Sequence, residues 1–346
     1  MTRWTLVQIR RKSGKLTTEE IVELKTFQRD FKEKVSQAYE RIRFGIKKTP
    51  LEHSPALSQL TGAEVYLKWE SEQLTGSFKL RGALNKLRAL SPEEKRRGVV
   101  SASTGNHGLG LSLAARIERV TLVLVLPATV SPSKRSRLRE YGAEIIEHGL
   151  SCERAEIYAR QLAAESGRIY VSPYNDEDII YGQGTTGLEI WGDLPGVQDV
   201  LIPVGGGGLA SGIAGYLKTA SPKIKAFGVE PRHSAFMAAS IDAGKIVEVE
   251  EKETIADAVA GGIEPGAITF PLCQELLDGM ILVEEELISE ALVLLKKTHD
   301  KIVEGAGALS LAALMKESGR FSGRQVVLVV SGGNASHHQI STQNCR

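Results

Sequence analysis

The stretch Val200-Leu201-Ile202-Pro203-Val204-Gly205-Gly206-Gly207-Gly208 joins a short apolar run to four consecutive glycines, and a segment with helical spacing of apolar residues follows over 209–219. A strand that is apolar at nearly every position must be buried on both faces, as the strands of parallel sheets are. A glycine turn that leads from such a strand into a helix is typical of wound α/β folds. The stretch therefore predicts an α/β protein.

Seven further segments have strand character and alternate with helical segments. The expected strands cover 64–69, 98–102, 121–126, 144–147, 169–171, 225–229 and 325–330. Amphipathic helices are expected between them, for example over 78–90, 152–165 and 284–303. Because 121–126 and 325–330 are apolar at almost every position, the strands are expected to be mostly parallel.

Composition restricts the class of protein. The chain has 346 residues, of which 42% are hydrophobic and 25% charged, so it can bury a core and keep a polar surface. Its 43 basic and 42 acidic residues leave a net charge of +1, which provides no general attraction for nucleic acid or an anionic membrane. The longest apolar runs are about eight residues, far below the ~20 needed to cross a bilayer. We expect neither a nucleic-acid partner nor a membrane partner.

The cysteines and the N-terminal segment indicate the compartment. Cys152, Cys273 and Cys345 lie far apart and form no CxxC pair, which is typical of a reducing environment. The first 15 residues lack the apolar core of a secretory signal. We therefore expect a cytoplasmic protein. Residues 1–35 carry a mixed charge run and are interpreted as an N-terminal extension, either a surface helix, an oligomer arm or a solvated tail.

The four glycines after 200–204 are the first candidate for a binding loop. Ligands of open parallel sheets bind beyond the carboxyl ends of the strands. A glycine run at such a place lets main-chain N–H groups converge on an anion, and a phosphate is the natural candidate. The run matches neither GxxxxGK[ST] nor GxGxxG, which argues against nucleoside triphosphate and dinucleotide sites. A flexible turn is the alternative.

Three other segments carry candidate polar groups. Ser103-Thr104-Gly105-Asn106-His107-Gly108 follows the strand at 98–102 and offers donors to a carboxylate, although Ser103 and Asn106 could be plain helix N-caps. Ser331-Gly332-Gly333-Asn334 follows the strand at 325–330. Lys79 falls in the expected first turn of a helix, where the helix dipole disfavours a charged ammonium. A lysine with a lowered pKa suits imine chemistry, although many helical lysines are only solvated.

The motifs TGSFKLRGA, STGNHG, VGGGG, EGAGA and VSGGN occur in this order, and with them the chain resembles the fold-type II pyridoxal phosphate enzymes of the threonine dehydratase and serine racemase family. The resemblance covers about residues 38–335. Within that group, the chain also resembles the hydroxyectoine utilisation dehydratases. The resemblance implies the tryptophan synthase β-like fold, with two wound parallel-sheet domains and the cofactor in the cleft. The implied large cofactor-binding domain is 36–97 with 179–346, and 98–178 is the small substrate-closing domain.

The resemblance implies a role for each motif around pyridoxal 5′-phosphate. Lys79 would hold the cofactor as an imine and act as the base at the substrate Cα. Phe78 would cover one face of the ring, Asn106 would bond the ring hydroxyl oxygen, and Glu304 would bond near the cofactor or the lysine. Ser331 would face the ring nitrogen. The main-chain N–H groups expected to bind the phosphate are those of Gly205, Gly206, Gly207, Gly208 and Leu209.

The loop after 98–102 would bind the substrate carboxylate through Ser103, Thr104, Gly105, Asn106 and His107. Serine racemases have a serine where this chain has Thr104, which still carries a hydroxyl, so racemisation stays open as an activity. Metal-activated members have an acid that Glu230 matches and a second acid where this chain has Phe236. A metal site is therefore left undecided.

The resemblance implies an ammonia-lyase reaction. The expected activity is β-elimination of a 3-hydroxy amino acid, L-threonine or L-serine, to a 2-oxo acid and ammonia. A serine hydroxyl supports a protonated ring nitrogen less than a carboxylate does, which favours rapid loss of the leaving group. The alternatives are a dehydratase for a hydroxyectoine-type or other 3-hydroxy amino acid, a serine racemase, or a non-enzymatic homologue that binds the cofactor. Members of the group usually form homo-oligomers.

Overall fold

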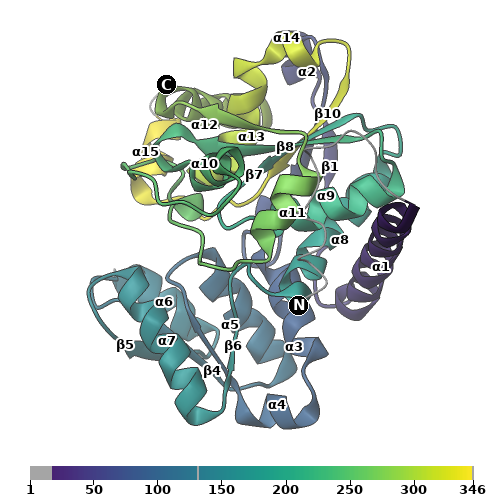
Figure 1. Ribbon diagram of the computed structural model, residues 1–346. Helices are drawn as coiled ribbons and strands as arrows, with labels where there is room; N and C mark the ends of the chain where they lie inside the picture. Colours follow the sequence, from purple (N-terminus) through teal and green to yellow (C-terminus); the bar gives the residue numbers. More distant parts are fainter. Residues whose placement is uncertain (1–17, 131, 345–346) are drawn as a thin grey trace.

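Two β-sheets form the frame of the protein, shown as a computed structural model in Figure 1; the structure describes residues 18–130 and 132–344. The strands are Leu51–His53 (β1), Glu64–Trp69 (β2), Val99–Ala102 (β3), Leu122–Leu126 (β4), Glu144–Glu147 (β5), Ile169–Tyr170 (β6), Asp199–Pro203 (β7), Lys225–Pro231 (β8), Gly279–Val283 (β9) and Gln325–Val330 (β10). One sheet has the order β1-β2-β10-β7-β8-β9 and the other the order β5-β4-β3-β6. Among these strands only β1 and β2 pair antiparallel, so the predicted parallel character is confirmed.

Helices connect the strands and cover the sheets. In Figure 1 the six-stranded sheet lies in the upper half, and the four-stranded sheet lies in the lower half with α5, α6 and α7. The helices are Thr18–Ile42 (α1), Pro55–Thr61 (α2), Lys79–Ala89 (α3), Pro92–Arg97 (α4), Asn106–Glu118 (α5), Pro132–Glu140 (α6), Cys152–Ser166 (α7), Glu177–Asp193 (α8), Gly208–Ala220 (α9), Phe236–Ala243 (α10), Thr269–Leu276 (α11), Glu285–His299 (α12), Gly305–Lys316 (α13), Ser318–Phe321 (α14) and His337–Asn344 (α15).

The central strand β10 is buried on both faces. Val327 and Val329 belong to a hydrophobic cluster with α9 and α11, whereas Val326 and Leu328 belong to a second cluster with α12 and α13. All four side chains are 0% exposed. Full burial of each such side chain contributes about 1.5–3 kcal/mol. The apolar residue at almost every position of the sequence is therefore explained by a helix layer on each side of the sheet.

The eight expected strands are all present, within one or two residues of the expected bounds. The sequence reasoning missed β1, which has only three residues, and β9. It predicted a helix over 284–303, but α12 ends at His299 because Asp300 adopts a left-handed φ of 54°. The chain then runs without helix until α13 begins at Gly305.

The C-terminal half of α1 packs on the body of the protein. Phe31 and Val35 are 1% and 0% exposed and belong to the hydrophobic cluster around α9. The Phe31 ring meets the ring of Tyr181 edge to face, with 5.2 Å between the centroids. Of the extension expected over 1–35, residues 1–17 lie outside the described residues. The part around Phe31 and Val35 is core, not a solvated tail.

Helix α3 packs its apolar side toward the four-stranded sheet. Leu80 and Leu84 share a cluster with Val99 of β3 and Leu109 of α5. The sequence reasoning assigned 36–97 to the large domain, so the hydrophobic clusters divide the chain differently at this helix. The domain ranges otherwise stay a prediction.

Glycines let α3 approach its neighbours at backbone distance. A Cβ on Gly182 of α8 would lie 2.6 Å from the Cα of Gly82, and a Cβ on Gly110 of α5 would lie 2.9 Å from the backbone nitrogen of Leu80. Such distances leave no room for any side chain, and backbone cannot move aside as a flexible side chain can. The first turns of α3 are therefore held between α5 and α8.

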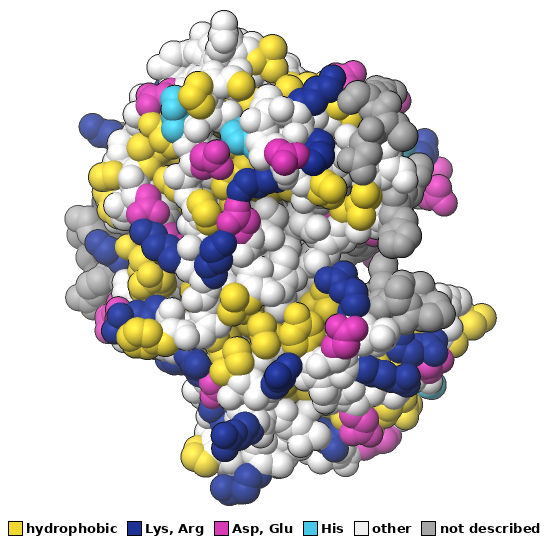
Figure 2. Space-filling model, turned by 180° about the vertical axis from the view of Figure 1, so that it is seen from behind, with side chains coloured by type: hydrophobic (Ala, Val, Ile, Leu, Met, Phe, Trp, Pro, Cys, Tyr) yellow, Lys and Arg dark blue, Asp and Glu magenta, His cyan; other side chains and the backbone are white. Residues whose placement is uncertain are grey.

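The surface carries charges of both signs, as the balanced composition predicts, and the cysteines that the structure describes are free thiols. On the face shown in Figure 2, basic and acidic side chains are interspersed. None of the helices in the described ranges is both long enough and apolar enough to span a bilayer. Cys152 is exposed, Cys273 is buried, and both are free thiols, while Cys345 lies outside the described residues.

We expect Gly182→Ala to lower the free energy of unfolding by about 1–3 kcal/mol, since overpacking at this contact would push α8 away from α3. The matched control is Gly192→Ala in the same helix, where an added Cβ would meet no atom within 4 Å. The control should be neutral or stabilising by up to about 1 kcal/mol. Urea denaturation of the two variants measures the difference, and equal effects would contradict the close contact.

Candidate active site

A cavity lies where the carboxyl ends of β7 and β10 meet the N-termini of α3, α5, α9 and α13. It brings together residues from motifs that are far apart in the sequence. The lining residues are Phe78, Lys79, Asn106, Tyr174, Pro203, Gly205, Gly206, Gly207, Gly208, Leu209, Ala258, Val259, Glu304, Ala306 and Ser331. The cavity thus contains every residue that the sequence reasoning assigned to cofactor binding.

Lys79 is the first residue of α3 and lines this cavity. Its Nζ donates a hydrogen bond to the carbonyl oxygen of Pro173 at 2.9 Å and lies 5.0 Å from the centroid of the Phe78 ring. Burial lowers the pKa of Lys79 to about 8, while the charge of Glu304 raises it. The sequence reasoning expected a lowered pKa from the helix dipole, but burial is the cause found here. A large neutral fraction near pH 8 makes this amine a nucleophile or a base.

The glycine loop presents unpartnered donors to the cavity. Helix α9 begins at Gly208, and its N-cap Gly207 has a left-handed φ of 85° and no side-chain cap. Within the described residues, the N–H groups of the loop from Gly205 to Leu209 make no hydrogen bond. A Cβ on Gly206 would lie 2.3 Å from the Tyr174 ring. Donors without partners at a helix N-terminus suit an anion such as phosphate.

Asn106 connects the two sides of the cavity. Its Nδ2 donates to Oε1 of Glu304 at 2.6 Å, and its Oδ1 accepts from Nδ2 of Asn334 at 2.7 Å. Asn334 also donates to the carbonyl oxygen of Thr75 at 2.9 Å. Glu304 was expected to bond near the cofactor or the lysine, and this role stays a prediction; in the structure its carboxylate holds Asn106, and its charge raises the pKa of Lys79. The asparagine is thereby fixed in the wall of the cavity that Lys79 also lines.

Ser331 follows β10 and is 3% exposed at the cavity wall. Its carbonyl oxygen accepts a hydrogen bond from the N–H of Phe78 at 3.2 Å. The neighbouring Gly332 pairs with Ser77 in an isolated β-bridge. The loop after β10 is therefore joined directly to the segment that carries Lys79.

The predicted carboxylate loop lies next to the cavity. Its residues Ser103, Thr104 and Gly105 are partly exposed and do not line the cavity itself. The hydroxyl oxygen of Ser103 accepts hydrogen bonds from the N–H groups of Gly105 at 3.3 Å and Gly108 at 3.1 Å. Helix α5 begins at Asn106 with Gly105 as its N-cap, so neither Ser103 nor Asn106 is the N-cap. The Ser103 hydroxyl therefore fixes the shape of the loop, while residues 103–105 remain partly exposed.

His107 turns away from the cavity. Its Nε2 lies 3.2 Å from Oγ of Ser101 and 3.3 Å from the carbonyl oxygen of Val171. Burial lowers the pKa of His107 to about 3, with a further lowering from Lys79 and a rise from the Val171 carbonyl. The imidazole is therefore neutral at neutral pH and holds the loop to β3 and to Val171, the residue after β6. The sequence reasoning placed His107 in the loop expected to bind the substrate carboxylate, and that role of the loop stays a prediction.

Glu230 caps a helix instead of joining a metal cluster. Its carboxylate accepts hydrogen bonds from the N–H groups of Met237 at 2.9 Å and Ala238 at 2.8 Å, at the start of α10. Burial raises its pKa to about 8, although these two hydrogen bonds lower it. Among the side chains that the structure describes, no group of three His, Cys, Asp or Glu could hold a metal ion.

Tyr174, Pro173, Ala258 and Val259 are cavity or lysine contacts that sequence reasoning missed. Tyr174 and Pro173 follow β6, and the Tyr174 hydroxyl accepts a hydrogen bond from the N–H of Glu264 at 2.9 Å. Their place just after a strand was the only signal that could have found them. Ala258 and Val259 lie in the short 3-10 helix Asp257–Val259, which carries no such signal.

The cavity fits pyridoxal 5′-phosphate, the cofactor that the sequence resemblance implies. The unpartnered N–H groups of the glycine loop suit its phosphate, Phe78 and Val259 provide apolar walls for a ring, and the Lys79 amine can react with its aldehyde. When bound, this cofactor supplies an electron-withdrawing ring that weakens the bonds at the Cα of an attached amino acid.

We expect Glu304→Gln to lower the pKa of Lys79, because the carboxylate that stabilises the ammonium is lost while the Oε1 acceptor for Asn106 remains. The neutral amine fraction at pH 7 then rises, so reductive methylation of Lys79 by formaldehyde should have its pH midpoint below that of the unmodified protein. Peptide mass spectrometry of the labelled protein measures this. The exposed Glu290→Gln is the control and should leave the midpoint unchanged; an unchanged or raised midpoint for Glu304→Gln would contradict the assignment.

Comparison with known proteins supports the same cofactor as the geometry of the cavity. A family model described as pyridoxal-phosphate dependent enzyme matches residues 42–332. The chain is 41% identical over 308 residues to L-threonine ammonia-lyase of Thermotoga maritima, covering 89% of this chain and 76% of that protein.

Solved structures agree. The fold is similar to the processed form of threonine deaminase isoform 2 from Solanum lycopersicum, with a TM-score of 0.86, 34% identity, and 91% and 92% of the two chains covered. It is also similar to maize serine racemase, with a TM-score of 0.85, 31% identity, and 91% and 96% covered. The family and fold predicted from the five motifs are confirmed: this chain belongs to the pyridoxal-phosphate dependent enzymes.

Proposed function

We propose that this protein is an ammonia-lyase that converts a 3-hydroxy amino acid to a 2-oxo acid and ammonia, with L-threonine and L-serine as the favoured substrates. The observation that carries the proposal is the buried Lys79 amine in one cavity with the glycine loop and Ser331. The relatives named L-threonine ammonia-lyase and threonine deaminase support the same reaction.

Lys79 moves the proton at Cα. With the cofactor bound, the Lys79 amine would take this proton; with a pKa of about 8, about a tenth of the amine is neutral at pH 7 and about half at pH 8. Glu304 opposes a further fall in that pKa and, through Asn106, keeps the polar wall of the cavity fixed. The Pro173 carbonyl orients the amine.

Ser331 directs the reaction toward elimination. A neutral hydroxyl beside the ring nitrogen stabilises a protonated ring less than a carboxylate does. With the cofactor bound, this weaker support of ring charge would favour departure of the substrate hydroxyl as water over return of a proton to Cα.

The loop after β3 binds the substrate carboxylate. Its N–H groups and the hydroxyls of Ser103 and Thr104 are the proposed donors, with Asn106 at the cavity end. This loop belongs to the four-stranded sheet, whereas the glycine loop and Ser331 follow strands of the six-stranded sheet. We therefore expect substrate binding to draw the small domain, 98–178, toward the large one.

Serine racemisation is the second candidate activity. The similarity to maize serine racemase and the hydroxyl of Thr104, at the place where serine racemases have a serine, favour it. Larger 3-hydroxy amino acids, including hydroxyectoine-type substrates, are a further option for the same elimination. We place the protein in the cytoplasm as a homo-oligomer.

We expect the protein with its cofactor to release ammonia and a 2-oxo acid from L-threonine and L-serine, and Lys79→Ala to reduce this release by at least about 100-fold because the base is lost. Borohydride fixation followed by peptide mapping identifies the cofactor-bearing residue. The screen includes larger 3-hydroxy amino acids and D-serine formation. Label on another lysine would contradict the assignment of Lys79, and release from none of the substrates with cofactor bound would favour a racemase or a binding protein.

Ser331→Asp should raise the ratio of racemisation to elimination by about tenfold, since a charged hydrogen bond stabilises the protonated ring nitrogen by about 1.5–3 kcal/mol. D-serine and pyruvate formed from L-serine measure the ratio. Ser331→Ala removes the hydroxyl without adding charge and should not raise it. Cofactor occupancy, followed by absorbance, is compared first because a buried carboxylate is costly. An unchanged ratio at full occupancy would place Ser331 away from the ring nitrogen.

A further inference from the structure

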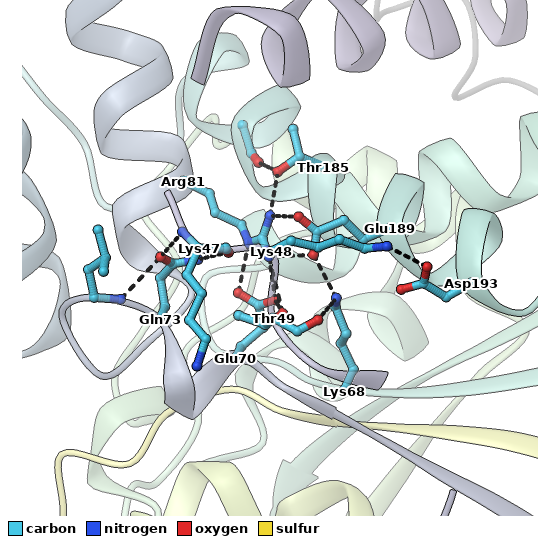
Figure 3. Close-up of polar contacts among 12 residues, drawn as sticks. Lys47, Lys48, Thr49, Lys68, Glu70, Gln73, Arg81, Thr185, Glu189 and Asp193 are labelled. Atoms are coloured by element: carbon cyan, nitrogen blue, oxygen red, sulfur yellow. Dashed lines mark hydrogen bonds and ion pairs between the residues drawn. The ribbon is translucent and has the colours of Figure 1, made fainter. Parts of the chain in front are cut away.

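A buried ion network lies beside the first turn of α3, as Figure 3 shows. The guanidinium of Arg81 donates to both carboxylate oxygens of Glu70 and to both of Glu189, each bond being 2.8 Å long. Lys68 donates to Oε2 of Glu189 at 2.6 Å. These side chains are 0% or 1% exposed. Two positive and two negative charges are thus paired away from water.

The network joins elements that are distant in the sequence. Lys68 is in β2 and Glu70 in the 3-10 turn Glu70–Glu72 that follows it, whereas Arg81 is in α3 and Glu189 in α8. Thr49 completes the arrangement by donating from Oγ1 to Oε1 of Glu70 at 2.6 Å. Removal of one member of such a network leaves a buried charge without its partner, which is strongly destabilising.

The first turn of α3 has no cap of its own. Its N-cap, Phe78, makes no side-chain hydrogen bond, and the first turn contains no acidic residue. Instead it carries Lys79 and Arg81, two cations at the positive end of the helix dipole, which is an unfavourable arrangement. Contacts from outside the helix must therefore hold this turn. Arg81 forms ion pairs with Glu70, in the 3-10 turn after β2, and with Glu189 of α8.

The charge of Arg81 is not among the causes of the lowered pKa of Lys79. Burial and Glu304 account for the pKa of Lys79. The guanidinium of Arg81 is only two residues away, but Glu70 and Glu189 balance its charge within the network. What the network does supply is a fixed place for the backbone from which the Lys79 side chain extends.

We propose that Arg81 is a positioning residue for Lys79: its forked pairing with Glu70 and Glu189 fixes the first turn of α3 so that the Lys79 amine meets the aldehyde of the cofactor. This inference rests on the proposed role of Lys79. In the step concerned, the neutral amine gives up two protons, a carbon–nitrogen double bond forms, and the aldehyde oxygen leaves as water. A shift of about 1 Å in a reacting group can cost 100-fold.

The test compares two ligands on protein freed of cofactor with hydroxylamine. Pyridoxal 5′-phosphate has the aldehyde and can bond to Lys79, whereas pyridoxamine 5′-phosphate has none and depends on the glycine loop and the other noncovalent contacts of the cavity. In Arg81→Lys the charge remains but the fork to two carboxylates is lost. We expect its affinity for pyridoxal 5′-phosphate to fall by about tenfold or more, with the affinity for pyridoxamine 5′-phosphate nearly unchanged. Borohydride trapping should slow in parallel.

Glu70→Gln is the second variant and serves if Arg81→Lys does not fold. It keeps the shape of the side chain but removes the negative charge that pairs with Arg81. It should also lose affinity for pyridoxal 5′-phosphate while its affinity for pyridoxamine 5′-phosphate stays nearly unchanged. Lys86→Ala is the matched control: Lys86 also ties α3 to α8, through Asp176 at 2.7 Å and Asp178 at 3.2 Å, but at the far end of the helix. It should change neither affinity.

Equal loss of affinity for both ligands in Arg81→Lys and Glu70→Gln, or no loss for either ligand, would overturn the proposal. Lys79→Ala separates this result from failure of the proposed function. If that variant still bound pyridoxal 5′-phosphate more tightly than pyridoxamine 5′-phosphate and still gave a borohydride-trapped adduct, the assignment of Lys79 itself would be wrong.

Discussion

Burial of the central strands on both faces is the constraint on which the rest of the molecule depends. Strands β7 and β10 are parallel neighbours, with Val200 opposite Val327, and helices must cover each side of them. Each connection therefore leaves a strand at its carboxyl end and enters a helix or loop there. The glycine loop after β7 and the Ser331 loop after β10 consequently open at the same edge of the sheet, which is where the cavity lies.

Burial also determines the chemistry of the site. The same exclusion of water that stabilises the sheet lowers the pKa of Lys79 to about 8 and that of His107 to about 3. The lysine is close to the cofactor cavity, so its neutral fraction becomes useful. The histidine bonds to Ser101 and Val171, so its neutral form only secures a loop. One physical effect thus gives two residues of one site different roles.

The lysine is presented by a helix whose place depends on its neighbours. Gly110 and Gly182 remove side chains where α5 and α8 touch the first turns of α3, and Arg81 pairs with carboxylates on both sides. The helix itself provides no cap. Close packing and paired charges, both made with distant segments, do what local capping does in other helices.

The sequence by itself determined eight of the ten strands that the structure describes, the glycine, Ser103 and Ser331 loops, and the family. The segments at 64–69, 144–147 and 325–330 match β2, β5 and β10 in both bounds because apolar patterning and glycine or proline turns act over a few residues. The same local chemistry placed Lys79 at a helix start and the glycine run before α9.

Only the tertiary structure decided which distant groups meet. Arg81 and Glu189 are 108 residues apart, Asn106 and Glu304 are 198 apart, and Lys79 reaches the carbonyl of Pro173 across 94. A charged or polar residue shows the same local pattern whether it is solvated or buried with a partner. The partner is chosen when the sheets and helices pack, since burial then makes an unpaired charge or donor too costly to keep.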